Sequence, residues 1–104
     1  MVSALKRQAE IEGGFAAVLA RGDSQAGAIL VILAEKGRKV RVLERALQGD
    51  GHYSWQDVGI QAAENEEEFK KFLDKRRKFD PDLWLIELDV ASAERFAAEM
   101  NLTV

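Results

Sequence analysis

The fold is decided by residues 28–58, which read AILVILAEKGRKVRVLERALQGDGHYSWQDV. The stretch opens with a run of apolar residues rich in Ile and Val, which is typical of a strand buried on both faces. Two turn dipeptides, Lys36-Gly37 and Asp50-Gly51, each separate two runs of strand-like composition. We therefore expect three consecutive antiparallel strands joined by two hairpins.

The two turns also predict which residues lie opposite each other. With Lys36-Gly37 as the first loop, Leu33 faces Val40, and with Asp50-Gly51 as the second loop, Ala46 faces Trp55. The core face then collects Ile29, Val31, Leu33, Val40, Val42, Ala46, Tyr53 and Trp55. The second face collects Leu30, Ile32, Arg41, Leu43, Arg45, Gln56 and Val58. The apolar members of the second face need a cover, either from a helix or from another chain.

Helices and further strands flank this meander. A helix is expected over residues 2–12, followed by a strand over 15–20. A second helix begins at Asn65, which forms a capping-box pattern with Glu68, and ends at Asp80-Pro81. A strand over 83–88 and a last helix capped by Ser92 complete the chain. The inner face of the last helix is predicted to be Ala93, Phe96, Ala97 and Met100.

This order, α-β-β-β-β-α-β-α, indicates an α+β protein in which helices pack on an antiparallel β-meander sheet. The chain has 104 residues, which is the size of a single globular domain spanning residues 1–104. No long apolar run or signal peptide is found, so a cytoplasmic protein without a membrane segment is expected. The absence of cysteine excludes disulfides, thiolate metal sites and cysteine nucleophiles.

Two groups of residues resemble a known family. The first is Gly13-Gly14-Phe15-Ala16-Ala17-Val18 with Gly22-Asp23 and Ala26-Gly27, and the second is Phe79-Asp80-Pro81-Asp82-Leu83-Trp84 with Arg77 and Glu87. Together with Trp55, they resemble domain of unknown function 1491, a small bacterial family. The resemblance runs from Ala4 to Asp89, and the chain from Val90 onward looks like an extension of its own. It implies a single domain and no particular activity.

Two charged stretches, residues 21–26 and 76–84, lie at the ends of predicted elements, where binding residues are often placed. The candidate ligand-binding residues are Arg21, Asp23, Arg76, Arg77, Asp80, Asp82, Trp84 and Glu87. Their carboxylates and arginines could hold a cation or bind a basic partner. The alternative is structural, with Asp80 and Asp82 bonded to the turn backbone and paired with Arg76 and Arg77. We expect the structural role.

No residue pattern indicates a catalytic nucleophile, a metal site or a cofactor-binding loop. The single histidine, His52, belongs to a hairpin tip, which is a poor place for a general base. We therefore expect a non-catalytic binding or protein-interaction module, one that binds a partner protein or associates with itself. A small enzyme or ligand-binding protein using Asp80, Asp82, Glu87, Arg76 and Arg77 is the alternative.

A nucleic-acid-binding protein is the third hypothesis. It would use basic strand and helix faces, formed by Arg38, Lys39, Arg41 and Arg45 and by residues 75–78. The net charge of -3 gives no general attraction to nucleic acid, and the aromatic residues Tyr53 and Trp55 fall on the predicted core face. Nucleic acid is therefore an unlikely partner by this criterion.

Overall fold

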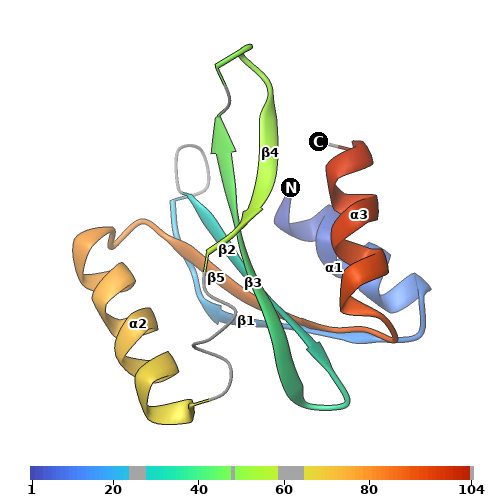
Figure 1. Ribbon diagram of the computed structural model, residues 1–104, viewed down its shortest axis with the longest axis horizontal. Helices are drawn as coiled ribbons and strands as arrows, with labels where there is room; N and C mark the ends of the chain where they lie inside the picture. The colour runs from blue at the N-terminus through green and yellow to red at the C-terminus, as the bar shows by residue number, and fades with distance from the viewer. Residues whose placement is uncertain (24–27, 48, 59–64, 104) are drawn as a thin grey trace.

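In the described part of the chain, one five-stranded sheet carries three helices. The computed structural model describes residues 1–23, 28–47, 49–58 and 65–103. Its elements are α1 (Val2–Ile11), β1 (Phe15–Ala20), β2 (Ile29–Glu35), β3 (Arg38–Leu47), β4 (Tyr53–Asp57), α2 (Glu66–Phe79), β5 (Trp84–Asp89) and α3 (Ala93–Thr103). This confirms the predicted α+β class and element order (Figure 1).

The strands lie in the order β1-β5-β2-β3-β4, so β1 and β4 are the two edges. The meander β2-β3-β4 is antiparallel, as predicted, and β1 is antiparallel to β5. The pair β2-β5 is parallel, which makes the sheet mixed rather than wholly antiparallel. The buried residues of β5, Leu85, Ile86 and Leu88, point to both faces, which suits a central strand covered on two sides.

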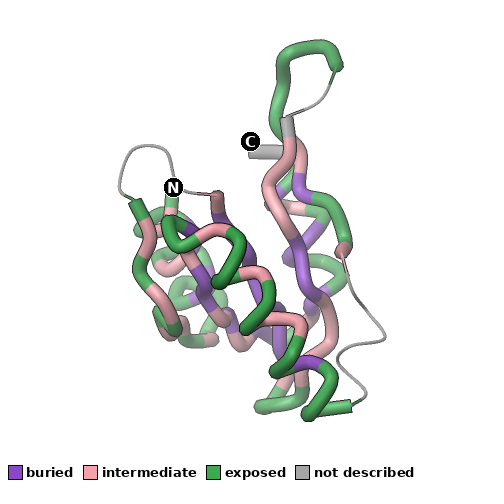
Figure 2. Tube along the Cα trace, turned by 90° about the vertical axis from the view of Figure 1, so that its left-hand side faces the viewer, coloured by how far each residue is buried: buried purple, intermediate pink, exposed green. Residues whose placement is uncertain are grey.

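The helices cover both faces of the sheet. α1 and α3 lie on one face, and α2 lies on the other (Figure 1). Buried residues concentrate in the strands between these layers (Figure 2). Leu30 and Ile32, for which the sequence predicted a covering helix or chain, are fully buried in one cluster with Phe69 of α2. The cover at this place is therefore a helix. Within the described ranges, no helix is long and apolar enough to cross a membrane.

The predicted register of the first hairpin is correct beside the turn and wrong beyond it. Glu35 pairs with Arg38 and Ala34 with Lys39, but the next pair is Leu33 with Arg41, because the register shifts there by one residue. Such a β-bulge gives β3 one extra residue, Val40, and reverses the face of every residue that follows. Val31 consequently pairs with Leu43 instead of Val42.

The faces of β3 are therefore exchanged relative to the prediction. Leu43 lies with Trp55 in the core cluster under α1 and α3, whereas Val42 lies in the cluster under α2. The second hairpin is also shifted by one residue, since Arg45 rather than Ala46 pairs with Trp55. Arg45 thus belongs to the face that the sequence analysis assigned to Ala46. Tyr53, predicted to be in the core, is 46% exposed.

Local signals in the sequence identify the first turn and two of the helix caps correctly. Both Lys36 and Gly37 have positive φ, at 52° and 81°, as a two-residue type I′ turn requires. The side chain of Asn65 accepts a hydrogen bond from the Glu68 amide at 3.1 Å, and Ser92 accepts one from the Arg95 amide at 3.2 Å. The predicted inner face of α3 is buried throughout.

Candidate ligand-binding cleft

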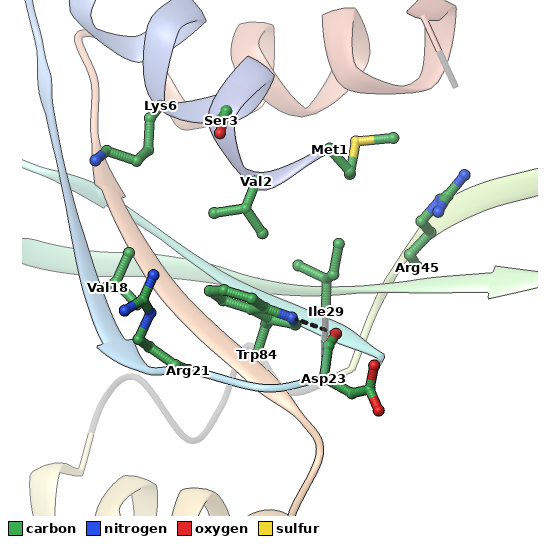
Figure 3. A pocket seen from close by; sticks show the side chains of 10 residues that line it. All are labelled: Met1, Val2, Ser3, Lys6, Val18, Arg21, Asp23, Ile29, Arg45 and Trp84. Carbon is green, nitrogen blue, oxygen red and sulfur yellow. Dashed lines mark hydrogen bonds between the residues drawn. The ribbon is translucent and has the colours of Figure 1, made fainter. Parts of the chain in front are cut away.

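A cleft of about 710 Å³ opens between the first turn of α1 and one end of the sheet (Figure 3). Its floor comes from four neighbouring strands, each of which contributes one residue: Val18 of β1, Trp84 of β5, Ile29 of β2 and Arg45 of β3. Ile29 and Trp84 are direct partners in the parallel pair β2-β5. The floor is therefore set by strand pairing, and it holds its residues in fixed positions.

The roof of the cleft is the amino-terminal turn of α1, with Met1, Val2, Ser3 and Lys6. Val2 packs against the core cluster under this helix, which ties the turn to the sheet. The amide of Leu5 donates to the Met1 carbonyl at 3.1 Å, so the helical hydrogen bonds begin there. The backbone amides that precede Leu5 have no acceptor within the helix, which gives this wall a partial positive charge.

The side wall is residues 21–23, which are fastened to the start of β5. The Trp84 indole Nε1 donates to the Asp23 carbonyl at 2.8 Å, and the Asp23 amide donates to the Asp82 carbonyl at 3.0 Å. Gly22 lies so close that an added Cβ would be 2.0 Å from the Asp82 carbonyl oxygen. Only glycine fits at this position, and the contact holds Arg21 and Asp23 beside the indole.

The cleft has an excess of positive charge. Its charged side chains are Lys6, Arg21 and Arg45 against the one carboxylate of Asp23. Lys6 and Arg21 lie on one side of the Trp84 indole and Arg45 on the other (Figure 3). Within the described part of the chain, none of the three cations forms an ion pair. A ligand with an anionic group would therefore meet three cations and one carboxylate, which together give the lining a net positive charge.

Arg45 is held in place by an aromatic ring. Its guanidinium lies 4.1 Å from the centroid of the Tyr53 ring, a cation–π distance. The Nε atom of Arg45 is buried and has no hydrogen-bond partner among the described residues. A buried donor without an acceptor is costly, so an acceptor supplied by a ligand would be favourable here.

The structure brings together three of the eight candidate residues predicted from the sequence. Arg21, Asp23 and Trp84 line the cleft. The other five, Arg76, Arg77, Asp80, Asp82 and Glu87, do not line it. Arg77 is exposed on α2, and Glu87 is half-buried in β5 between Ala17 and Ile32.

Arg76 and Asp80 have structural partners. Arg76 pairs with Glu44 of β3, which links α2 to the sheet, and not with the aspartates as the structural alternative required. Asp80 ends α2, and its side chain accepts a hydrogen bond from the Asp82 amide at 3.2 Å. This bond forms the turn that leads into β5.

The basic strand residues are divided between different contacts. Arg41 lies 3.7 Å from a carboxylate oxygen of Asp57, and the Lys39 ammonium lies 5.8 Å from the centre of the Phe69 ring. His52 is exposed beside the hairpin turn, where its amide donates to the Asp50 side chain at 3.0 Å. In the described ranges, no three metal-ligating side chains come together.

The sequence analysis missed Lys6 and Arg45 as cleft residues. Arg45 was assigned to the wrong face because one bulge residue near Val40 reverses the strand, and no turn signal marks that residue. Lys6 joins the cleft through the packing of α1 on the sheet, which helical periodicity does not locate.

A family model described as "Protein of unknown function (DUF1491)" matches residues 1–98. The crystal structure of a DUF1491 family protein from Caulobacter crescentus is similar, with a TM-score of 0.76, 32% identity, and coverage of 91% of this chain and 88% of that one. A solution structure of a protein from A. tumefaciens has a TM-score of 0.68 and 30% identity, covering 91% of this chain and 86% of that one. The family match extends past Val90. The expectation that the residues from Val90 onward are an extension outside the family is therefore wrong. A search of the curated proteins finds no match.

Proposed function

Since the chain belongs to the DUF1491 family, whose description carries no activity, we propose its function from the cleft: a non-catalytic module that binds a small, planar, anionic molecule. The observation that carries this proposal is the position of three cations around one indole ring, none of which forms an ion pair with a described residue. The anionic group of the ligand would lie between Lys6 and Arg21, and its flat part against Trp84. Arg45 would meet the far end of the ligand.

The dimensions of the cleft support a small molecule. Ligand pockets are typically about 300–1,000 Å³, and this cleft of about 710 Å³ is within that range. Val18 and Ile29 add apolar surface beside the indole, so a ring could lie against these groups while its charge faces the cations. A few directed polar groups beside apolar surface are usual for binding sites.

The chemistry of the cleft residues supports binding rather than catalysis. A guanidinium does not lose its proton in proteins, so Arg21 and Arg45 act as fixed donors and not as acids or bases. Among the described lining residues, Asp23 is the one carboxylate, and the Ser3 hydroxyl has no histidine beside it to activate it. A cytoplasmic location and a homodimer belong to the same proposal. The homodimer would use a surface other than the second face of the meander, because α2 covers Leu30 and Ile32 there.

Thermal unfolding with four probes tests the proposal: pyrophosphate, indole, adenosine monophosphate and salicylate. The last two combine a ring with an anion and should raise the melting temperature most. A probe at 100 times its dissociation constant stabilises a fold by about 2.7 kcal/mol. Failure of both combined probes to raise the melting temperature would contradict the planar-anion proposal.

Matched variants place the binding in the cleft. Arg21→Gln and Arg45→Gln should each weaken the best probe by about tenfold or more, as the loss of a charged hydrogen bond does. Arg38→Gln is the control, because Arg38 is exposed on the same strand as Arg45 and does not line the cleft. Equal weakening by the control would show that general charge, and not the cleft, attracts the probe.

A further inference from the structure

β1 is an open edge of the sheet with an apolar, uncharged sequence. Its neighbour on one side is β5, and the strand order gives it none on the other. The strand reads FAAVLA, and three of its side chains are exposed: Phe15 by 60%, Leu19 by 49% and Val18 by 37%. Proteins normally protect such edges with charged residues, proline or a covering segment, because free backbone groups and apolar side chains attract another strand.

We propose that β1 pairs antiparallel with β1 of a second copy of this chain, joining two sheets into one continuous sheet. The two copies would be related by a two-fold axis perpendicular to the joined sheet. Residues of the two β1 strands that lie directly opposite each other then point to the same face of that sheet. With Ala17 on the axis, Ala16 lies opposite Val18 of the second copy, within the regular part of β1. Phe15 then approaches Leu19, the residue at which the register shifts, so that the two most exposed side chains of the strand lie near each other.

The charges at the ends of β1 favour a second copy as the partner. Glu12 comes just before the strand, and Arg21 comes directly after it. Antiparallel pairing brings the Glu12 end of one copy beside the Arg21 end of the other, so that opposite charges approach. Parallel pairing would bring Arg21 beside Arg21. No charge lies between these ends, so two identical strands meet without repulsion.

An irregularity between Val18 and Ala20 limits the length of this pairing. The register of β1 with β5 is regular from Phe15 to Val18 and shifts after Val18. A bulge of this kind twists an edge and shortens its regular part. One short strand pair buries less than the roughly 1,600 Å² of a standard interface, so dissociation in the micromolar range is expected.

Sedimentation equilibrium between about 5 and 500 µM tests the dimer, a range chosen to bracket a micromolar dissociation constant. The expected heavy species has twice the chain mass of 11.6 kDa, and it should increase with concentration. The variant Phe15→Lys with Leu19→Lys should raise the dissociation constant at least about tenfold, since lysines at an edge oppose pairing. Because both positions are exposed, the thermal unfolding of this variant should remain close to wild type.

The control variant places two lysines on the opposite edge, as Tyr53→Lys with Gln56→Lys, at exposed positions of β4. It should dimerise as the wild type does. Amide hydrogen exchange gives a second measurement: protection in residues 15–18 should rise with concentration, while protection in residues 53–57 should not. A wild-type monomer throughout, a species heavier than a dimer, or a dimer unaffected by the β1 lysines would overturn the proposal.

Discussion

The two edge strands of the sheet differ in what contacts their outer backbone groups. At β4, the side chain of Asn101 in α3 accepts a hydrogen bond from the Trp55 amide at 2.8 Å and donates one to the Trp55 carbonyl at 3.4 Å. This side chain replaces the neighbouring strand that β4 lacks. At β1, the strand order supplies no neighbour, and exposed apolar residues follow one another.

The comparison shows that an open edge is not a general property of this fold. The same chain closes one edge with a helix that reaches over it, whereas no strand of the described ranges pairs with the outer edge of β1. α3 can close β4 because Met100 is buried against the sheet and brings Asn101 to the strand backbone. The difference between the edges is what makes β1, and not β4, the proposed contact between two copies.

The largest expected effect comes from the residue that anchors β4. Trp55 is 4% exposed and lies in the core cluster under α1 and α3. Trp55→Ala should lower the free energy of unfolding by roughly 3–5 kcal/mol, as other aromatic truncations in cores do. Urea denaturation followed by circular dichroism measures this loss. Tyr53→Ala, two residues away on the same strand but 46% exposed, is the control and should cost far less.

The second helix provides a related comparison. Phe69 and Phe72 are three residues apart in α2 and therefore lie on one face of the helix, but Phe69 is buried and Phe72 is half-buried. Periodicity identifies the face of a helix correctly without ranking the residues on it, because the rank depends on where the helix is docked. We therefore expect Phe69, which the sheet under α2 buries more fully, to contribute more to the free energy of unfolding than Phe72.

The next largest effect concerns the end of β1. An added Cβ at Gly22 would lie 2.0 Å from the Asp82 carbonyl oxygen, so Gly22→Ala should push residues 21–23 away from β5. Overpacking of this kind costs about 1–3 kcal/mol. It should also break the bond from the Trp84 indole to the Asp23 carbonyl. In a Trp55→Phe background, Trp84 is the one tryptophan left, and its emission should shift to the red.

Gly49→Ala is the matched control for Gly22→Ala. No atom lies within 4 Å of an added Cβ at Gly49, so the melting temperature and emission should stay as in the parent protein. Equal effects of the two substitutions would mean that the end of β1 is not fixed by the Gly22 contact. The cleft wall would then lack the rigidity that the proposed function requires.

The parts of the fold that follow from local chemistry were predictable. The Asn65 cap, the Lys36-Gly37 turn and the inner face of α3 each depend on neighbouring residues. The position of β5 between β1 and β2 was not predictable from these signals. It depends on pairing between segments far apart in the chain, for which hydrophobic pattern alone gives no partner.

The cleft residues were predictable only in part, for the same reason. Arg21, Asp23 and Trp84 were among the candidates because they belong to charged stretches at element ends, whereas the other five candidates do not line the cleft. Arg45 was missed because a single bulge residue moved it to the other face. A site assembled from four neighbouring strands needs their register, and one shift of one residue changes which side chains meet.

Asn101→Ala should have a smaller effect on stability and a distinctive effect on association. Its removal leaves the Trp55 amide and carbonyl without their side-chain partner, at a cost of about 1 kcal/mol. The β4 edge would then resemble the β1 edge. With two open edges per chain, species larger than a dimer should appear in sedimentation, whereas Glu94→Ala, an exposed change on α3, should produce none. An unchanged distribution of species would show that Asn101 does not protect β4.

The smallest expected effect is the difference in the free energy of unfolding between substitutions of Asp80 and of Asp82, which lie beside the cleft wall. Asp80 accepts a hydrogen bond from the Asp82 amide at 3.2 Å, so Asp80→Asn weakens a charged acceptor and should cost about 1 kcal/mol or less at this half-exposed turn. Asp82 is exposed, and its carboxylate has no hydrogen-bond partner within the described ranges. Its contact with the cleft wall is made by the backbone carbonyl, which accepts a hydrogen bond from the Asp23 amide. Asp82→Asn should therefore change the free energy of unfolding by less than about 0.5 kcal/mol. A larger loss from Asp82→Asn than from Asp80→Asn in paired urea titrations would mean that the Asp82 side chain, and not its backbone, holds the end of β1 to β5.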